Sequence, residues 1–574
     1  MKKFVFLAAT LLVCCTLLMT ASTLMAATGP QMNAQQGVRQ GDGPGGDVNM
    51  RDLPDLSPAD RAVVRQIPSH RTPGMSEAQY QAAKSAASHS GMGPRPQDAA
   101  RLQAPKNPNT DIASETPSAF IDFLAQSEGC AGTGWVPSDM GLAVNATYIV
   151  QVVNECIGVY TKATGALVVS KDLCGIFGLP QSAGTTGCFD PRVLYDAQAA
   201  KFLVTASYSD VNGNGWLLTA ATGNPTLAWH HHQIAFGATL VDYPTLGQVA
   251  YLNNATNSAF AMCANLFENN GGFTDECIFP SKKGIYGTLG SFPVWYNFTL
   301  GGVIQNSMQP VDSYELSDNP RAQYVINSVN DNGGICHASG GGENGLVVWA
   351  FSGNTAGQSH ASALYTGCGS TSTYNFPADA DNAGYCAQCI ETLDNRISAK
   401  TFYSQGEIVP SIDAWNGGSS EVLGWRIHPS LDVNGGACTG GVLCPNLTAV
   451  AVENEWCYGC GYGAGASAFF GSQAFDPEND WTMFATFASS SESPGQFYDT
   501  QRVSNLQPFI DSGTYSCVAN HSYSGRWGDY SAAAPDDPGK TPANVPATWG
   551  SGMYVNGTGT WGTCIAGVRP QDGP

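Results

Sequence analysis

The sequence predicts an all-β protein, a disulfide-braced β-propeller of six to eight four-stranded blades with seven favoured, after a flexible N-terminal leader. Short apolar runs separated by turn signals recur at roughly fifty to sixty residues per unit, a repeat size close to that of kelch-type propellers. Long amphipathic helical periods are absent from this region, which disfavours helical and alternating β/α folds. A closed ring also shields the edges that a large open sheet would leave bare. Two or three tandem β-sandwiches are the alternative.

The clearest unit extends from Asp190 to Ile234. It contains four runs rich in β-branched and aromatic residues, at 192–195, 201–208, 216–220 and 227–234. Asn212-Gly213 and Gly223-Asn224 lie in two of the breaks and tolerate the positive φ of tight hairpin turns. We therefore expect a four-stranded antiparallel meander, which is one propeller blade. Further strands are expected at 148–153, 156–160, 166–170, 249–252, 259–264, 323–329, 346–351, 421–427, 448–452, 467–470, 481–487, 549–555 and 560–568.

Two segments precede the predicted propeller domain of residues 118–570. Residues 1–27 have the charged start, apolar run and small-residue end of a secretory signal peptide, with an uncleaved membrane anchor as the alternative. Residues 28–117 are rich in Gln, Gly, Pro and Ala, so they predict a low-complexity leader or linker. Helical fragments can begin in it at Ser57 and at Ser76, where Gln79 completes a capping-box spacing, and such helices fit a removable pro-segment or a plain linker.

Sixteen cysteines follow the predicted signal peptide, and an even number in an exported chain predicts a disulfide framework. Two pairs have CxxC spacing, which also occurs in zinc and redox sites, but disulfides are favoured in this context. The candidates are Cys130, Cys156, Cys174, Cys188, Cys263, Cys277, Cys336, Cys368, Cys386, Cys389, Cys438, Cys444, Cys457, Cys460, Cys517 and Cys564.

Charge and hydropathy restrict the partners. The formal net charge is -21 and only 12% of residues are charged, with no visible cluster of Lys and Arg, so nucleic acid is not expected as a partner. No second apolar segment reaches membrane-spanning length, so no membrane span is expected after signal cleavage. The protein is therefore expected to be secreted, as an extracellular, cell-surface or periplasmic protein.

Five segments, at 137–154, 190–206, 242–247, 525–538 and 560–570, together resemble a family of secreted bacterial β-propeller proteins of no settled activity. They include DPRVLYD, DYPTLG, GRWGDYSA and TWGTCIA. The resemblance touches both ends of the region from about 135 to 570 and therefore implies one closed ring and export. It implies no catalytic residues.

Several of these segments place an acidic residue at the start of a strand run. Because the strand nearest a propeller axis begins near a channel mouth, such residues can ring the pore and bind a cation or polar ligand. The alternative is that the aspartates cap turns and pair with Arg192 or Arg526 to pin the blades. The pore or ligand candidates are Asp190, Arg192, Asp242, Tyr243, Arg526, Asp529 and Tyr530.

Two further sequence patterns suggest metal-binding sites. Asp210, Asn212 and Asn214 have the oxygen spacing that begins a calcium loop, although Ala221 stands where an EF-hand needs glutamate, and an ordinary turn is the alternative. Calcium is the one cofactor that the sequence suggests. His230 and His232 share a face of a predicted strand and can share a metal, but no third ligand is evident, so a polar outer strand is the default.

Two functions follow. The first is a non-enzymatic binding protein whose propeller face or pore recognises a glycan or a surface protein. The second is a secreted, glycosidase-like hydrolase that uses carboxylates lining the pore. Convergence of several carboxyl groups with raised pKa values at the pore would favour the enzyme, whereas an open rim of Tyr and Trp would favour binding.

Overall fold

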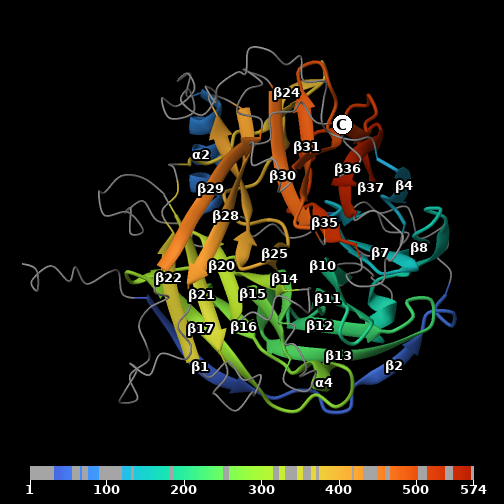
Figure 1. The fold of residues 1–574 in the computed structure, drawn as a ribbon, viewed down its shortest axis with the longest axis vertical. Helices are drawn as coiled ribbons and strands as arrows, with labels where there is room; N and C mark the ends of the chain where they lie inside the picture. The colour runs from blue at the N-terminus through green and yellow to red at the C-terminus, as the bar shows by residue number, and fades with distance from the viewer. Residues whose placement is uncertain are drawn as a thin grey trace, which may run out of the picture.

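A computed structural model describes the chain over residues 32–54, 65–66, 75–89, 119–130, 135–154, 156–180, 187–249, 258–313, 322–329, 345–352, 363–369, 371, 374–416, 419–430, 449–458, 466–476, 478–501, 514–536 and 547–570. The predicted signal peptide and the helix start at Ser57 lie outside the described residues. The strands are arranged as a β-propeller around a central axis, which confirms the predicted fold class (Figure 1). In Figure 1 the colour runs once around the ring, from green through yellow and orange to red.

The paired strands of the described residues form seven groups of four, which follow one another in chain order. In each group the strands are given from the inside of the ring outward. The first group is β6 (Gly141–Val144), β7 (Tyr148–Val153), β8 (Cys156–Thr161) and β9 (Leu167–Asp172). The second is β10 (Gly187–Asp196), β11 (Lys201–Ser209), β12 (Gly215–Thr222) and β13 (Ala228–Gly237). The third is β14 (Thr239–Val249), β15 (Phe260–Glu268), β16 (Phe273–Ile278) and β17 (Phe292–Leu300).

The fourth group is β19 (Gln309–Ser313), β20 (Gln323–Ser328), β21 (Leu346–Ser352) and β22 (Ala363–Gly369). The fifth is β25 (Thr401–Ser404), β26 (Glu407–Val409) continued by β27 (Ser411–Asn416), β28 (Ser419–Ser430) and β29 (Ala449–Tyr458). Pro410 separates β26 from β27, because proline has no N–H to give to the ladder. The sixth is β30 (Ala466–Phe475), β31 (Trp481–Ser489), β32 (Gly495–Gln501) and β33 (Thr514–Cys517).

The last group joins the two ends of the ring. It contains β35 (Ala532–Pro535), β36 (Thr548–Gly557) and β37 (Thr560–Val568), and its outermost strand is β4 (Ile121–Ser127) from the other end of the domain. Phe123 lies opposite Ile565 in this antiparallel pair. Backbone hydrogen bonds between β4 and β37 thus join the two ends of the domain in one sheet and close the propeller.

Hydrophobic side chains fill the space between neighbouring groups. The large side chains that are fully buried include Trp229, Trp349, Trp425 and Trp549. The inner strands of three neighbouring groups also pair directly, since β19 runs parallel to β14 on one side and to β25 on the other. The core is therefore a set of contacts between adjacent sheets, arranged around the axis.

The predicted leader contributes elements to the ring. Strand β1 (Met32–Arg39) pairs with the outer strand β17, and β2 (Gly46–Asn49) pairs with β13. Helix α2 (Glu77–His89) packs against residues between the fourth and fifth groups, and its start has the predicted capping box: Gln79 N–H donates to Ser76 Oγ at 3.3 Å. A polar sequence can add an edge strand because backbone groups, which every residue carries, form the ladder.

Smaller elements complete the described residues. A parallel pair joins β3 (Arg65–Gln66) to β5 (Trp135–Val136), and β18 (Val303–Ile304) extends β17. Strands β23 (Ala380–Asn382), β24 (Cys386–Glu391) and β34 (Gly525–Arg526) form a small sheet between segments far apart in sequence. Two short helices are η2 (Cys174–Phe177) and α4 (Lys282–Ile285).

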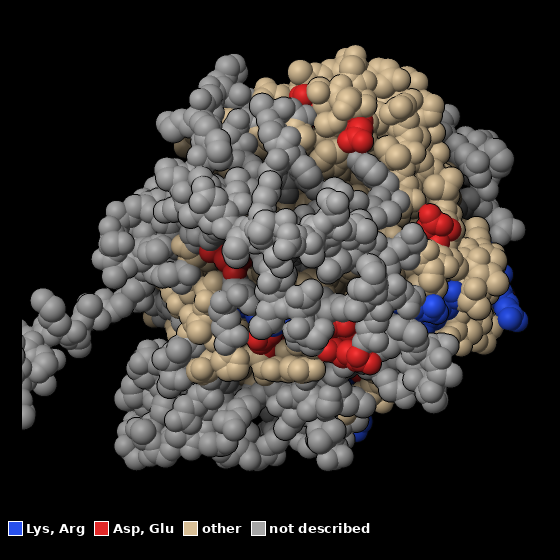
Figure 2. Space-filling view, turned by 45° about the horizontal axis from the view of Figure 1, so that its top comes forward, with Lys and Arg blue, Asp and Glu red and all other residues tan. Residues whose placement is uncertain are grey.

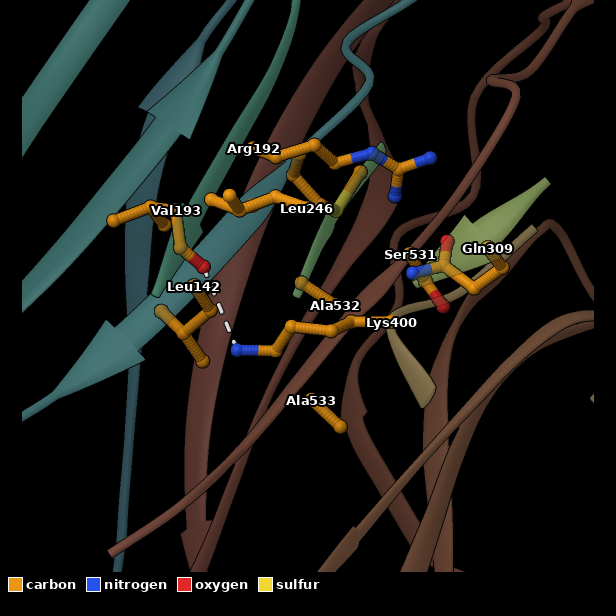
Figure 3. Close-up of a pocket in the computed structure, with 11 residues that line it drawn as sticks. Leu142, Arg192, Val193, Leu246, Gln309, Lys400, Ser531, Ala532 and Ala533 are labelled. Carbon is orange, nitrogen blue, oxygen red and sulfur yellow. Dashed lines mark hydrogen bonds between the residues drawn. The ribbon is translucent and has the colours of Figure 1, made fainter. Parts of the chain in front are cut away.

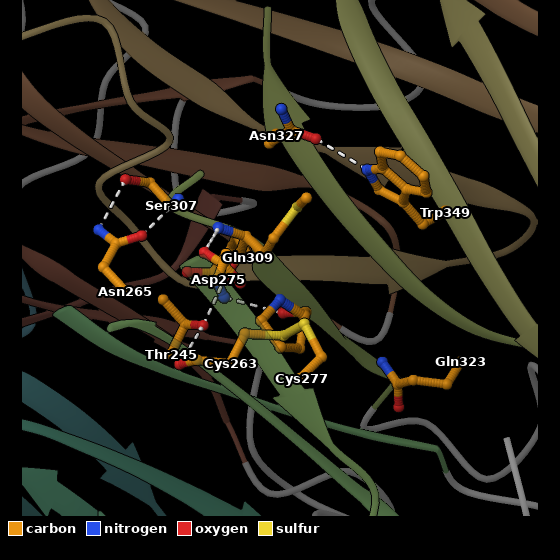
Figure 4. The surroundings of a disulfide bond; sticks show 12 residues. Thr245, Cys263, Asn265, Asp275, Cys277, Ser307, Gln309, Gln323, Asn327 and Trp349 are labelled. Atoms are coloured by element: carbon orange, nitrogen blue, oxygen red, sulfur yellow. Dashed lines mark hydrogen bonds between the residues drawn. A yellow bond between two sulfur atoms is a disulfide. The ribbon is translucent and has the colours of Figure 1, made fainter. Parts of the chain in front are cut away.

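Disulfides brace the propeller, as predicted. The bridges are Cys130–Cys156, Cys174–Cys188, Cys263–Cys277, Cys386–Cys389 and Cys517–Cys564, and Cys368 and Cys457 are also disulfide-bonded. The four remaining candidates, Cys336, Cys438, Cys444 and Cys460, lie outside the described residues. Cys263–Cys277 links opposed residues of β15 and β16 and lies among buried polar side chains (Figure 4).

Within the described ranges, no helix has the length and apolar character needed to cross a membrane. On the face shown in Figure 2, acidic side chains lie in separate places, and the lysines and arginines gather mainly at one side.

Candidate functional site

The innermost strands begin at one end of the axis with unusual backbone geometry. Asp139, Asp190 and Tyr243 have φ values of 39°, 52° and 52°, and Phe470 has 51°. The pairing register shifts directly after Phe189, Asp242 and Phe469, which marks β-bulges. Non-glycine residues adopt this region only when surrounding contacts hold them there. The strand starts are therefore fixed by specific partners.

Those partners are side chains of a neighbouring blade. Asp190 Oδ2 accepts a hydrogen bond from the Tyr243 N–H at 2.9 Å, and Asp413 Oδ1 accepts from the Phe470 N–H at 2.8 Å. Asp139 Oδ1 accepts from the Asp529 N–H at 2.6 Å across the ring closure. These bonds satisfy buried backbone donors at the bulges. Asp139, Asp190 and Asp413 thus pin adjacent blades, which is the structural role that the sequence offered as an alternative.

Arginine and tyrosine side chains pack together beside these aspartates. The Arg192 guanidinium carbon lies 3.4 Å from the ring centroid of Tyr530, and the Tyr243 and Tyr530 rings meet edge to face at 5.5 Å. Arg192 donates to the carbonyl oxygens of Pro244 and Ser398, at 3.1 and 3.2 Å. The expected pairing of Arg192 with an aspartate is therefore replaced by backbone contacts. The flat guanidinium stacks on the aromatic face and keeps its edge for hydrogen bonds.

Asp242 has the carboxyl group best suited to chemistry in this cluster. Its side chain is buried, with 6% of its surface exposed, and among the described residues no hydrogen bond reaches its carboxylate. Burial raises its pKa to about 7, and Asp529 adds to the shift while Arg396 and Arg526 oppose it. Burial, with Asp242 and Asp529 nearby, likewise raises the pKa of Asp190 to about 8. Several carboxyl groups therefore share one buried place and cannot all ionise at neutral pH.

A narrow axial cavity begins next to this cluster. It has a volume of about 10 Å³, close to the space one water needs, and Arg192, Leu246, Gln309 and Ser531 are among its lining residues. The Lys400 side chain extends across it and donates to the Val193 carbonyl at 3.5 Å (Figure 3). Lys400 also pairs with Asp312 at 3.2 Å, and burial lowers its pKa. Among the described residues, Lys400 thus crosses the axis below the cluster, and a larger ligand is expected to approach from the cluster end.

The structure brings all seven predicted pore residues to this end of the axis. Asp529 is paired there with Arg526, as expected, and Tyr530 follows in the chain. Sequence reasoning missed Asp139, Asp394 and Arg396. Asp139 lies in the segment PSDMG, just before the apolar run at 141–144, as Asp190 comes just before the run at 192–195, so comparing these positions could have found it. Arg396 is held by Asp394 through two hydrogen bonds of 2.8 Å, a local pair with no distinctive sequence signal.

The suggested calcium loop is a turn between β11 and β12. Asp210 Oδ1 accepts hydrogen bonds from the N–H groups of Asn212 and Asn214, at 2.8 and 2.9 Å, and Asn214 Nδ2 donates to Asp210 Oδ2 at 3.0 Å. These bonds lower the pKa of Asp210. The carboxylate is used by its own turn, so the ordinary-turn interpretation explains these contacts. The described residues contain no set of three His, Cys, Asp or Glu side chains placed to hold a metal.

His230 and His232 share a face of β13, as predicted, with ring centroids 4.9 Å apart. Both contact the leader. His230 Nδ1 lies 2.8 Å from Asp47 Oδ1, and His232 Nδ1 lies 2.5 Å from Asp42 Oδ1. The outer strand β13 therefore binds the chain around β2 through these histidines. The contacts agree with the alternative of a polar outer strand without a metal.

No family model and no curated protein matches this chain. Solved structures similar to it include an exo-β-1,3-galactanase from Phanerochaete chrysosporium with galactose, 10% identical over 78% of this chain and 99% of that chain, with a TM-score of 0.28. The Dos1 propeller is 8% identical over 73% and 75%, with a TM-score of 0.31. Drosophila Plexin A, in complex with Semaphorin 1b, is 6% identical over 80% and 88%, with a TM-score of 0.30. At these scores the likenesses support no argument about function.

Proposed function

We propose that this protein is an extracellular hydrolase of glycosidic bonds and that its reaction takes place at the axial cluster. The observation that carries the proposal is the buried carboxyl group of Asp242, which accepts no hydrogen bond from the described residues and whose pKa is raised to about 7. Such a group is half protonated at neutral pH and can give its proton to a leaving oxygen. The disulfides favour an exported protein, and the sequence resemblance to secreted bacterial propellers is part of the same proposal.

The proposed roles divide the carboxyl groups of the cluster. Asp242 is the proton donor. Asp529, which accepts a hydrogen bond from Arg526 and is partly exposed, is the second carboxylate, acting on the sugar carbon or on a water. Asp190 and Asp139 keep the strand starts in place and have no direct part in the reaction. A glycan is the proposed substrate class because carboxylates and guanidinium groups bind hydroxyl groups.

The test is a reducing-end assay on a panel of polysaccharides with the full-length protein. Asp242→Asn should lower kcat by about 10² to 10⁴, the usual loss of a general acid or base. Asp122→Asn, a matched change at an exposed position of β4, should leave kcat unchanged. Because the donor must carry its proton, the wild-type rate should fall as the pH rises through about 7. Equal rates for wild type and Asp242→Asn would refute the assigned role.

A binding function without turnover is the second candidate, and the small size of the axial cavity favours it. A cavity of about 10 Å³ cannot enclose a sugar ring, and Asp139 and Asp190 accept hydrogen bonds that hold neighbouring blades together. A glycan array separates the two candidates. Binding that persists in Asp242→Asn, with no product from any substrate in the panel, would select the binding protein and reject the hydrolase.

A further inference from the structure

Helix α2 docks on the propeller through one face. Tyr80, Lys84 and Ala87 are buried, whereas Gln81 and Ser85 between them are exposed. Spacings of four and three residues place the buried side chains on one side of a helix. A helix of 13 residues is marginal by itself in water, so docking is what keeps it formed.

The docked face is held mainly by polar contacts. The Tyr80 hydroxyl donates to Glu391 Oε1 at 2.7 Å, and Trp415 Nε1 donates to the Ala87 carbonyl at 2.8 Å. Lys84 Nζ donates to Thr392 Oγ1 at 2.8 Å and pairs with Asp379 at 2.9 Å. Burial lowers the pKa of Lys84, and the nearby Asp379 carboxylate opposes this shift. Removing one member of a buried ion pair leaves the other charge without its partner, which strongly destabilises the docked state. One substitution at Lys84 should therefore release the helix.

The residues that hold α2 also border the axial cluster. Glu391 lies 4.0 Å from the Arg526 guanidinium, and Arg526 donates to Asp529. On the other side, Lys84 interacts electrostatically with Asp394, which holds Arg396, and with Asp413. Each of the two buried polar side chains of α2 is therefore one ionic contact away from the residues around Asp242.

We infer that α2 is an intramolecular inhibitory segment, which covers the outer border of the axial cluster and limits access to Asp242 and Asp529 while it is docked. Its release would open the approach from the cluster end, the direction from which a larger ligand is expected. Control of access by α2 is inferred from these contacts, whereas control of hydrolysis rests on the proposed function.

The experiment uses the full-length chain with Lys84→Glu, which places a negative charge against Asp379, Asp394 and Asp413. Ala82→Glu introduces the same side chain at an exposed position of α2 and is the matched control. Limited proteolysis reports cleavage within 75–89. Carbodiimide labelling, read by peptide mass spectrometry, reports access to Asp242 and Asp529 without requiring any activity. Lys84→Glu should increase both cleavage and labelling severalfold, and Ala82→Glu should match wild type.

Tyr80→Phe removes only the bond to Glu391 and is the milder second variant, with a smaller rise in both readouts. Unchanged labelling in a variant whose helix is cleaved faster would overturn the inference. So would the absence of release in both variants, or loss of cooperative unfolding in both, because α2 would then be a permanent part of the fold. Increased labelling without turnover by any form would leave the inference standing and reject the proposed hydrolase.

Discussion

Single carboxyl groups set the geometry of the axial end. Asp413 accepts hydrogen bonds from the Phe470 N–H through both oxygens, and Phe470 holds a positive φ within the β-bulge that follows Phe469. Asp190 accepts from the Tyr243 N–H through Oδ2 alone, and Tyr243 also has a positive φ. A residue that looks catalytic in sequence can therefore be required by the backbone of the next blade, and only its contacts separate the two roles.

Asp413 should make stability depend on pH. Burial raises its pKa to about 8, against about 4 for an unfolded aspartate. Between these values the folded state binds more protons than the unfolded state, so the free energy of unfolding falls as the pH rises. Asp413→Asn keeps an acceptor for Phe470 and cannot ionise. Its stability relative to wild type should improve from pH 4 to pH 8, as measured by urea unfolding at several pH values. A constant difference across that range would contradict the assignment.

Among elements, the disulfides differ in how much chain they restrict. Cys263–Cys277 spans 14 residues and Cys386–Cys389 spans 3. Loop entropy predicts stabilisation of about 3 kcal/mol for the longer loop and about 2 kcal/mol for the shorter one. Replacing Cys263 and Cys277 with alanine should therefore lower the free energy of unfolding by more than the same change at Cys386 and Cys389. Urea unfolding of both double variants checks the order, and the reverse order would show that packing around the bridges dominates.

Elements also show what the sequence could predict. The blade containing Asp190 was predictable because its signals are local: β-branched runs, Asn-Gly turns and an acidic strand start. Strands β1 and β2 were not, since a Gln-rich segment such as Met32–Arg39 gains its structure from the free edge of β17. Arg396 was missed for a similar reason: its position at the axis depends on how distant blades meet.

At the scale of the whole molecule, the pairing of β4 with β37 closes the ring, whereas β1 only extends one sheet outward. Proline removes an N–H and fits poorly inside a sheet. Phe123→Pro in β4 should lower the urea midpoint of unfolding strongly, and Val38→Pro in β1 should lower it much less. If the two variants lost equal stability, closure would contribute no more than an edge strand.

The shared sheet of β4 and β37 places residues 121 and 567 opposite each other, although they lie at the two ends of the domain sequence. The ring therefore has no structural need for a particular starting blade. A circular permutation can join these neighbouring positions with a short linker and open new ends in an exposed turn such as Asp210–Gly213. The permuted chain should still fold into the same propeller.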